Sequence, residues 1–276
     1  MAKVGCAGSG ASRSLIPTNI GYSEGMDSGS NTSIAKGAFQ TDSFALKIIA
    51  IIGMTADHIG NAFYSQLPLV ARCILFAPGG LTFPIMAYLL TVGYQHTRDV
   101  RRYALRLAVF ALLSTLPFVW VLGNKLNVMF TLLMGLGIIW ADDHLKNRAA
   151  FAGLLVAAIL ASHWCDWSYI GVPMILLYHR GKDTAWRTLA PVALVWLMGL
   201  SFIIDPLLQG TWQQYWTYFM PSLLYCFVGA TATIPLLSAY GGKQGLPLKY
   251  FFYAYYPVHI ALIGLARGLL FGIWWH

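Results

Sequence analysis

The sequence predicts an all-α, polytopic transmembrane helix bundle of about nine spans with a cytoplasmic N-terminus. Hydrophobic residues make up 58% of the 276 residues and charged residues only 10%, a composition that does not suit a soluble surface. Apolar blocks recur roughly every 25 residues from Phe44 to Trp275, which is typical of membrane-spanning helices. Basic residues fall mainly in alternate connections between these blocks. The solvent for most of the chain is therefore expected to be lipid.

The first 42 residues differ in kind from the rest. They are rich in Gly, Ser, Thr and Asn and poor in large apolar side chains, so they cannot bury enough surface to fold alone. We expect a disordered cytoplasmic tail over residues 1–42 and a transmembrane helical domain over residues 43–276. The four cysteines show no metal-ligand spacing, so they are expected to be small apolar packing residues and no metal site is predicted.

Nine apolar blocks are predicted to span the membrane. They are residues 43–62, 80–95, 103–122, 126–141, 149–162, 169–179, 187–204, 218–239 and 249–275. Asp42 is a suitable N-cap for the first helix, and Gly123-Asn124-Lys125 is typical of a tight turn between the third and fourth spans.

Two of these blocks and one further segment are short for a membrane core of about 30 Å. Residues 149–162 and 169–179 either form a broken or re-entrant pair around the sequence HWCDWSY or extend into the flanking polar residues. The apolar segment Leu67–Ala77 is too short to span and is expected to lie at the membrane interface.

Lysine and arginine concentrate on one side of the predicted bundle. The tail and the even-numbered connections hold 13 of the 18 basic residues: Lys3, Arg13, Lys36, Arg98, Arg101, Arg102, Lys146, Arg148, Arg180, Lys182, Arg187, Lys243 and Lys249. By the positive-inside rule these segments are cytoplasmic, and an odd number of spans places the C-terminus outside. Topology therefore explains the basic composition, and nucleic-acid binding is not expected.

Asp57 and His58 are the first candidates for chemistry, because ionisable residues inside apolar helices are costly and usually functional. They lie about 21 Å along the first helix at about 1.5 Å per residue. An Asp that accepts a hydrogen bond from one imidazole nitrogen fixes the tautomer and leaves the other nitrogen as a general base. The alternative is a water-exposed pair at a helix end.

His259 is the second candidate, about 15 Å into the last helix and so near the membrane midplane. Pro257 removes a backbone hydrogen bond just before it, which opens a helix around a ligand. Tyr256 lies about one turn earlier, and Arg267 follows two turns later on a similar face, so both are candidate substrate contacts. A core histidine bonded to tyrosine is the alternative.

A basic cluster ends the second span and begins the following loop. It comprises His96, Arg98, Arg101 and Arg102. Arg suits phosphate oxygens, so this cluster is a candidate site for a nucleotide-derived acyl donor. Topological anchoring explains the same charges equally well.

Further polar residues lie near the predicted outer side. Asn127 at the start of the fourth span, and Asp166 and Tyr169 near the start of the sixth, are candidates to orient a substrate amine or hydroxyl. An Asn at that position is more often a helix cap. His163, Cys165 and Asp166 lack the partner motif that a zinc site requires.

Five sequence motifs, in this order, resemble the TraX family. They are ADHIG in the first helix, TFPIMAYLLTVGYQHTR through the second, NVMFTLLMGL opening the fourth, DWSYIGVPMILLYHR at the sixth and KYFFYAYYPVHI in the last. The resemblance runs from about Lys47 to Leu265 and excludes the tail. Named members of that family are linked to N-terminal acetylation of conjugative pilin.

The resemblance implies an acetyl-CoA-dependent acetyltransferase of the bacterial inner membrane, with kinship to the wider transmembrane acyltransferases. The family pattern falls on Asp57, His58, Phe83, Pro84, His96, Asn127, Tyr169, Gly171, Tyr256 and His259. Family members often carry an Arg shortly before the Phe-Pro pair, where this chain has Gly79-Gly80-Leu81-Thr82. The role of that Arg is therefore vacant or taken by Arg72.

These observations combine into one hypothesis for the reaction. Acetyl-CoA phosphates dock near Arg98–Arg102, the acyl group reaches a cavity between the first and last helices, and His58 or His259 deprotonates the amine of a pilin or another acyl acceptor. Direct transfer and an acyl-histidine intermediate both stay open. The competing hypotheses are a transporter or proton-coupled channel, an O-acyltransferase acting on a sugar, and a noncatalytic pilus-assembly partner.

Overall fold

The computed structural model describes residues 40–123, 125–181 and 184–275. Almost all of the predicted tail, residues 1–42, lies outside these described residues. Within the described ranges the chain is helical and forms no strand, which confirms the predicted all-α class. The elements are α1 Ser43–Ala62, α2 Leu69–Phe76, η1 Ala77–Leu81, α3 Thr82–His96, α4 Val100–Leu122, α5 Val128–His144, α6 Arg148–Ala161, η2 Ser162–Trp164, α7 Ser168–Arg180, α8 Thr184–Leu208, α9 Trp212–Leu223, η3 Leu224–Gly229, α10 Ala230–Ser238 and α11 Lys249–Phe271.

Six helical segments in the described ranges are long and apolar enough to cross a membrane. They are Ser43–Ala62, Leu69–His96, Val100–Leu122, Ala185–Leu208, Tyr215–Ser238 and Tyr250–Phe271. Helices α5, α6 and α7, which match three of the nine predicted spans, have 17, 14 and 13 residues. The predicted number of nine is thus not confirmed.

The prediction of a separate interfacial segment at Leu67–Ala77 is wrong. Helix α2 continues through the 3₁₀ turn η1 into α3, giving one helical run of 28 residues from Leu69 to His96. Pro78 lies in η1, within this run, and its missing N–H coincides with the change from α-helical to 3₁₀ geometry. The segment therefore forms the beginning of a long apolar helix.

Several helices begin at the capping residues that the sequence contains. The Asp42 carboxylate accepts a hydrogen bond from the backbone N–H of Ala45 at 2.7 Å. Asp99 caps α4 and Asn147 caps α6 in the same manner. Each cap satisfies backbone donors that the first helical turn leaves unpaired.

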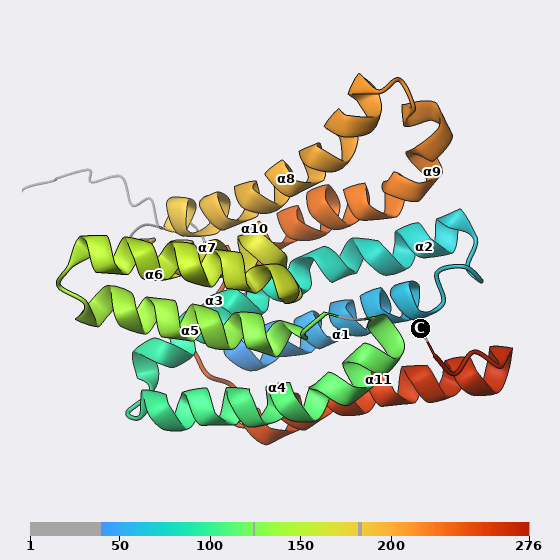
Figure 1. Cartoon of the computed structure of the whole chain (residues 1–276). Helices are drawn as coiled ribbons and strands as arrows, with labels where there is room; N and C mark the ends of the chain where they lie inside the picture. Colours follow the sequence, from blue (N-terminus) through green and yellow to red (C-terminus); the bar gives the residue numbers. More distant parts are fainter. Residues whose placement is uncertain (1–39, 124, 182–183, 276) are drawn as a thin grey trace, which may run out of the picture. The chain divides into compact units, whose positions relative to one another are not determined.

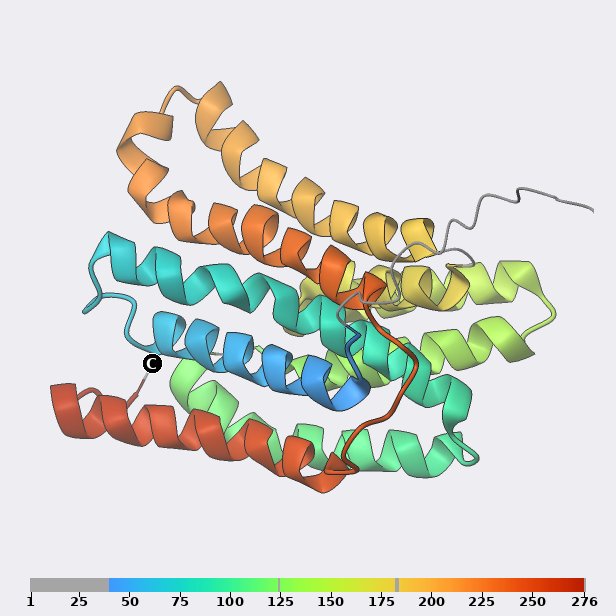
Figure 2. The same ribbon diagram turned by 180° about the vertical axis from the view of Figure 1, so that it is seen from behind.

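The helices lie roughly parallel to one another, with α1 near the middle of the bundle and α4 and α11 side by side (Figure 1). Helices α5 and α7 pack together, and α6 packs on both of them. In both views these three helices are displaced along the bundle axis relative to α1 (Figures 1 and 2). The α4–α5 connection and η2 therefore lie level with the middle of α1.

The helix pair η1 and η3 approaches closely enough to require glycine. A Cβ on Gly80 would lie 1.9 Å from the Tyr225 carbonyl oxygen, and a Cβ on Gly229 would lie 2.0 Å from the Ala77 carbonyl oxygen. No side chain fits at either position, because the obstructing atoms are backbone. The π-helical turn η3 contains Tyr225, and such turns are frequent at functional sites.

Residues 239–248 connect α10 to α11 and cross the end of the bundle at which α1 begins (Figure 2). Thr41 and Tyr240 form an isolated parallel bridge, and the Ser43 backbone N–H donates to the Lys243 carbonyl at 2.9 Å. This connecting segment is therefore fixed to the start of α1.

Candidate functional site

A cavity of about 480 Å³ runs through the bundle between α1, α3, α4 and α11. Its lining at one end includes the exposed residues His96, Gly242 and Gln244, so the cavity opens there, beside the start of α1. Its other end includes Asp57 and His58. This volume falls in the range of pockets that hold small molecules and cofactors.

His58 lines the deep end of this cavity and pairs with His259, which is not part of the lining. Their Nδ1 and Nε2 atoms are 2.8 Å apart, and the two rings stack with centroids 5.0 Å apart. Both side chains are 5% exposed, although they are 201 residues apart in the sequence. Helices α1 and α11 therefore join two of the three predicted catalytic residues in one hydrogen-bonded pair.

The hydrogen bonds fix the tautomer of each neutral ring. His259 Nδ1 lies 2.8 Å from the Tyr255 carbonyl oxygen, which only accepts, so this nitrogen carries the proton. Its Nε2 is then an acceptor and receives the His58 Nδ1–H. The Nε2 atom of neutral His58 is therefore left with a free lone pair, as a general base requires.

Aromatic residues hold this pair in place. The Tyr255 ring stacks on His259 with centroids 4.8 Å apart, and its hydroxyl is 2.7 Å from the Thr55 hydroxyl of α1. Tyr256 meets His58 edge-on at 6.1 Å between ring centroids. Because every ring is braced by another helix, the orientation of His58 is set before any ligand arrives.

The expected hydrogen bond from His58 to Asp57 is a wrong prediction. Adjacent helical residues point about 100° apart, and Asp57 lies against η1, where a Cβ on Gly79 would come within 2.6 Å of the Asp57 Cβ. Asp57 lines the cavity, but the partner of His58 is His259. The Asp57 carboxylate and the His58 imidazole therefore border one cavity but do not form a hydrogen bond with each other.

A second carboxylate at the deep end, Asp166, comes from the loop between η2 and α7. The backbone of this loop is fixed, since Leu126 N donates to Trp164 O at 2.8 Å and Asp166 N donates to Leu126 O at 2.7 Å. Trp167 follows with φ 64° and ψ 7°, a left-handed conformation that is unfavourable for a bulky residue.

Two cations that the sequence analysis missed lie at the open end. Lys47 and Arg106 both line the cavity, and the Arg106 guanidinium lies 5.5 Å from the centre of the Tyr103 ring. Lys47 lies over the Phe252 ring at 5.3 Å. Neither residue belongs to the basic tail and connections counted for topology, and both face the cavity from within apolar helices.

The predicted cofactor-binding cluster divides between the cavity and the surface. His96 lines the open end of the cavity, whereas the exposed residues Arg98, Arg101 and Arg102 do not. Arg102 pairs with Asp99 at 3.0 Å on the surface. A donor that enters the cavity would therefore meet Lys47 and Arg106 rather than these three arginines.

The predicted substrate contacts have different positions. Tyr256 lines the deep end and is 4% exposed. Asn127 is the buried N-cap of α5, its amide donating to the Ala111 carbonyl and its oxygen accepting from Met129 N. Tyr169 is 48% exposed and stacks on His163 outside the cavity. Asn127 therefore has the capping role that was its alternative.

Arg267 lies at the end of α4, away from the cavity lining. Its guanidinium donates to the carbonyl groups of Val121 at 3.2 Å and Trp120 at 3.3 Å. These carbonyls belong to the last turn of α4 and have no helical partner. Arg267 thus caps the C-terminal end of α4. It does not line the cavity, where a substrate contact was predicted.

The chain matches the model of the TraX protein over residues 43–267. The chain belongs to the TraX family. It is also 30% identical over 245 residues to a probable fimbrial assembly protein of Dichelobacter nodosus, FimC of serogroup H1, and that match covers 82% of this chain and 96% of the relative. No solved structure matches it.

The remaining residues of the TraX pattern support the deep end of the cavity. Phe83 is 1% exposed and stacks on Trp167 with ring centroids 4.4 Å apart. A Cβ on Gly171 would lie 2.4 Å from the Thr131 methyl group and 3.2 Å from Phe83. These residues hold the loop that carries Asp166. In the part of this TraX chain that the structure describes, no group of three His, Cys, Asp or Glu side chains is placed to hold a metal ion.

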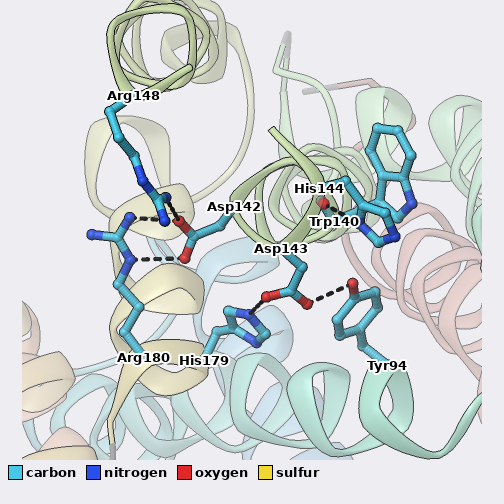
Figure 3. A network of polar contacts seen from close by, with 8 residues as sticks. All are labelled: Tyr94, Trp140, Asp142, Asp143, His144, Arg148, His179 and Arg180. Atoms are coloured by element: carbon cyan, nitrogen blue, oxygen red, sulfur yellow. Dashed lines mark hydrogen bonds and ion pairs between the residues drawn. The ribbon is translucent and has the colours of Figure 1, made fainter. Parts of the chain in front are cut away.

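A separate polar network ties the far ends of α3, α5, α6 and α7 (Figure 3). Asp142 receives two bonds from Arg180, at 2.6 and 2.8 Å, and one from Arg148 at 3.2 Å. The hydrogen bonds from Arg180 lower the pKa of Asp142. Asp143 accepts from the Tyr94 hydroxyl at 2.8 Å and lies 2.9 Å from His179. This network joins helices and does not line the cavity, so we assign it to the stability of this TraX protein.

Proposed function

We propose that this protein is a membrane-embedded acetyltransferase that uses acetyl-CoA to acetylate an amine of a fimbrial or pilin subunit. The observation that carries the proposal is the buried His58–His259 pair at the deep end of a cavity. Its free lone pair on His58 Nε2 suits a general base, and acyl transfer to an amine needs one. Membership of the TraX family and the fimbrial assembly relative support the choice of acceptor.

The charges along the cavity suit a phosphate-bearing donor that enters from the cytoplasm. Lys47 and Arg106 lie toward the open end, and Asp57 lies ten residues beyond Lys47 on α1, about 15 Å along the helix. In our proposal the donor phosphates bind the two cations and the thioester extends toward His58. The open end is on the side of the basic connections, which the positive-inside rule makes cytoplasmic.

The proposed reaction balances with groups of this chain. His58 Nε2 takes a proton from the acceptor ammonium, and the neutral amine attacks the acetyl carbonyl, forming a C–N bond. The C–S bond then breaks, and the leaving thiolate takes a proton from His58. The products are an amide and the free thiol, with one proton released from the amine overall. His259 holds the His58 tautomer throughout and stabilises its charged form.

Purified protein in lipid nanodiscs, given labelled acetyl-CoA and the pilin subunit of the same organism, tests the proposal directly. We expect label on the pilin and a mass increase of one acetyl group. If the label stays on acetyl-CoA and pilin from cells lacking the protein has an unchanged intact mass, the enzyme proposal fails. Acetylation of a sugar hydroxyl would replace the acceptor class, and coupled solute or proton flux without transfer would favour a transporter.

The donor position has its own prediction. Replacing Lys47 and Arg106 together by Gln should raise KM for acetyl-CoA by about 100-fold or more, since each charged hydrogen bond contributes about 1.5–3 kcal/mol and each 1.4 kcal/mol is about a factor of ten. Lys146→Gln is the matched control, because Lys146 is exposed on the α5–α6 connection and does not line the cavity. An unchanged KM in the double variant would place the donor elsewhere.

A further inference from the structure

We propose that Asp57 and Asp166 form an ammonium subsite beside His58, so that the acceptor is selected by the positive charge of its amine. The inference rests on the proposed function and assigns the acceptor side of the same cavity. Both carboxylates line the deep end, from α1 and from the η2–α7 loop. Neither forms a salt bridge within the described residues.

The surroundings of the two carboxylates contain the groups that a bound ammonium requires. An ammonium has three donors, and two carboxylates and a neutral imidazole nitrogen provide three acceptors. Aromatic rings of Tyr256, Trp167 and Tyr225 form the neighbouring lining, and their faces favour a cation over an anion. The cations that line the cavity, Lys47 and Arg106, lie at its other end. Lys125 is close enough to act on Asp166, but its ammonium donates to the Ser168 hydroxyl at 3.2 Å and forms no salt bridge with the carboxylate.

Tyr256 provides a second, independent observation at the deep end of the cavity. Its side chain is 4% exposed and lines the cavity, and the Val128 backbone N–H points toward its oxygen, yet the hydroxyl proton has no acceptor within the described residues. Buried hydroxyl groups are rarely left unpaired, because the lost hydrogen bond costs about 1–3 kcal/mol. Because the three ammonium donors are directed at the carboxylates and His58, the partner of the Tyr256 hydroxyl would be an acceptor oxygen of the bound substrates, such as the acetyl carbonyl.

Hydrogen bonds and ring stacking hold the loop that carries Asp166 in one conformation. Its backbone is bonded to Leu126 on both sides, and the Asp166 Oδ1 accepts from Trp167 N at 3.0 Å. Trp167 keeps a left-handed conformation because its ring is stacked on Phe83. Strain of this kind persists where the surrounding packing overrides it, and it concentrates at functional sites.

The subsite changes how the transfer begins. The amine arrives as an ammonium, whose two carboxylate partners hold it beside His58 Nε2, and one N–H proton passes to that nitrogen. The remaining N–H bonds stay directed at the carboxylates while the lone pair attacks the acetyl carbon. A hydroxyl acceptor lacks the charge, so the same site binds it weakly.

Direct binding separates this proposal from the proposed function. The probe is the N-terminal decapeptide of the organism's mature pilin, compared with the same peptide lacking its α-amino group, each titrated into the protein in nanodiscs without donor. We expect at least a tenfold tighter Kd for the free-amine peptide. Asp166→Asn should abolish this preference, since Asn keeps the hydrogen bond to Trp167 N but loses the charge. Asp99→Asn, a change at a half-exposed N-cap outside the cavity lining, should retain it.

The outcomes distinguish the two proposals. If acetyl transfer occurs in the wild type but Asp166→Asn keeps both its free-amine preference and its KM for pilin, the ammonium subsite is refuted and the enzyme proposal stands. Loss of the preference in Asp166→Asn, with KM for acetyl-CoA unchanged, supports the subsite. If the preference exists in a protein that transfers no acetyl group, the subsite holds and the enzyme proposal fails. Equal binding of both peptides to the wild type refutes the subsite outright.

Discussion

The hydrogen bond between His58 and His259 predicts that His58 is the general base and that His259 only fixes its tautomer. Replacing His259 with Phe keeps a ring stacked on Tyr255 but removes the acceptor for His58 Nδ1–H. The proton of neutral His58 is then free to move to Nε2, which removes the base. His58→Ala removes the base altogether.

The structure sets the size of each effect. A buried donor left without its acceptor costs about 1–3 kcal/mol, and each 1.4 kcal/mol is about a factor of ten in rate. We expect kcat of His259→Phe to fall by about 10- to 100-fold. Loss of a general base costs about 10²- to 10⁴-fold, so His58→Ala should be more severe. KM for acetyl-CoA should not change in either variant, because neither side chain lies near the cationic end.

The assay is acetyl transfer measured as kcat and KM for the two single variants, the double variant and His259→Gln. Because His259 acts through His58, the double variant should be no worse than His58→Ala alone. His259→Gln offers an amide oxygen as acceptor and should recover part of the loss. If His259→Phe lowers kcat more than His58→Ala does, or if the two losses multiply in the double variant, His259 acts directly on the substrate. The assignment of His259 as the residue that holds the His58 tautomer would then be wrong.

Two further predictions concern stability in detergent. Gly80→Ala forces a Cβ to within 1.9 Å of the Tyr225 carbonyl, so it should destabilise the fold by about 1–3 kcal/mol and lower Tm. Gly137→Ala, at an exposed position of α5 with no atom within 4 Å of the added Cβ, should match or exceed the wild type; equal Tm values for both variants would contradict the close packing of η1 on η3. Asp142→Asn should lower Tm at pH 7, and because the folded pKa of Asp142 is depressed, its contribution is present above the unfolded pKa of about 3.9 and lost as the pH falls through the folded value. A Tm difference that grows on acidification would contradict that sign.

The sequence alone predicted which residues form helices better than which residues meet. Each of the nine predicted spans falls on a helix, because apolar blocks and caps such as Asp42 are local signals. The partner of His58 was assigned to its neighbour Asp57, and only the packing of α11 on α1 shows it to be His259. Contacts between residues 201 positions apart leave no local signal in one sequence.

Charged residues were the hardest to place. The cluster from Arg98 to Arg102 attracts attention by its density, yet those side chains are exposed. Lys47 and Arg106 stand singly within apolar helices, and their orientation depends on which helix face meets the cavity. Arg267 was predicted to lie on the same face of the last helix as His259 and to contact substrate. Its guanidinium instead donates to carbonyl groups at the C-terminal end of α4. Burial on one face of a helix is set by its neighbours, which a single sequence does not specify.

The topology prediction left the region of α6 and α7 open, and the short helices α5 and α7 explain the site best. Because they begin level with the middle of α1, the irregular backbone of the η2–α7 loop lies at the depth of Asp57 rather than at the membrane surface (Figure 1). Irregular backbone at such depth requires protein partners for its polar groups, and the bonds between Leu126, Trp164 and Asp166 supply them. Two full-length spanning helices would carry this loop past the cavity. The shortness that conflicts with the predicted span count is thus what brings the second carboxylate to the deep end of the cavity.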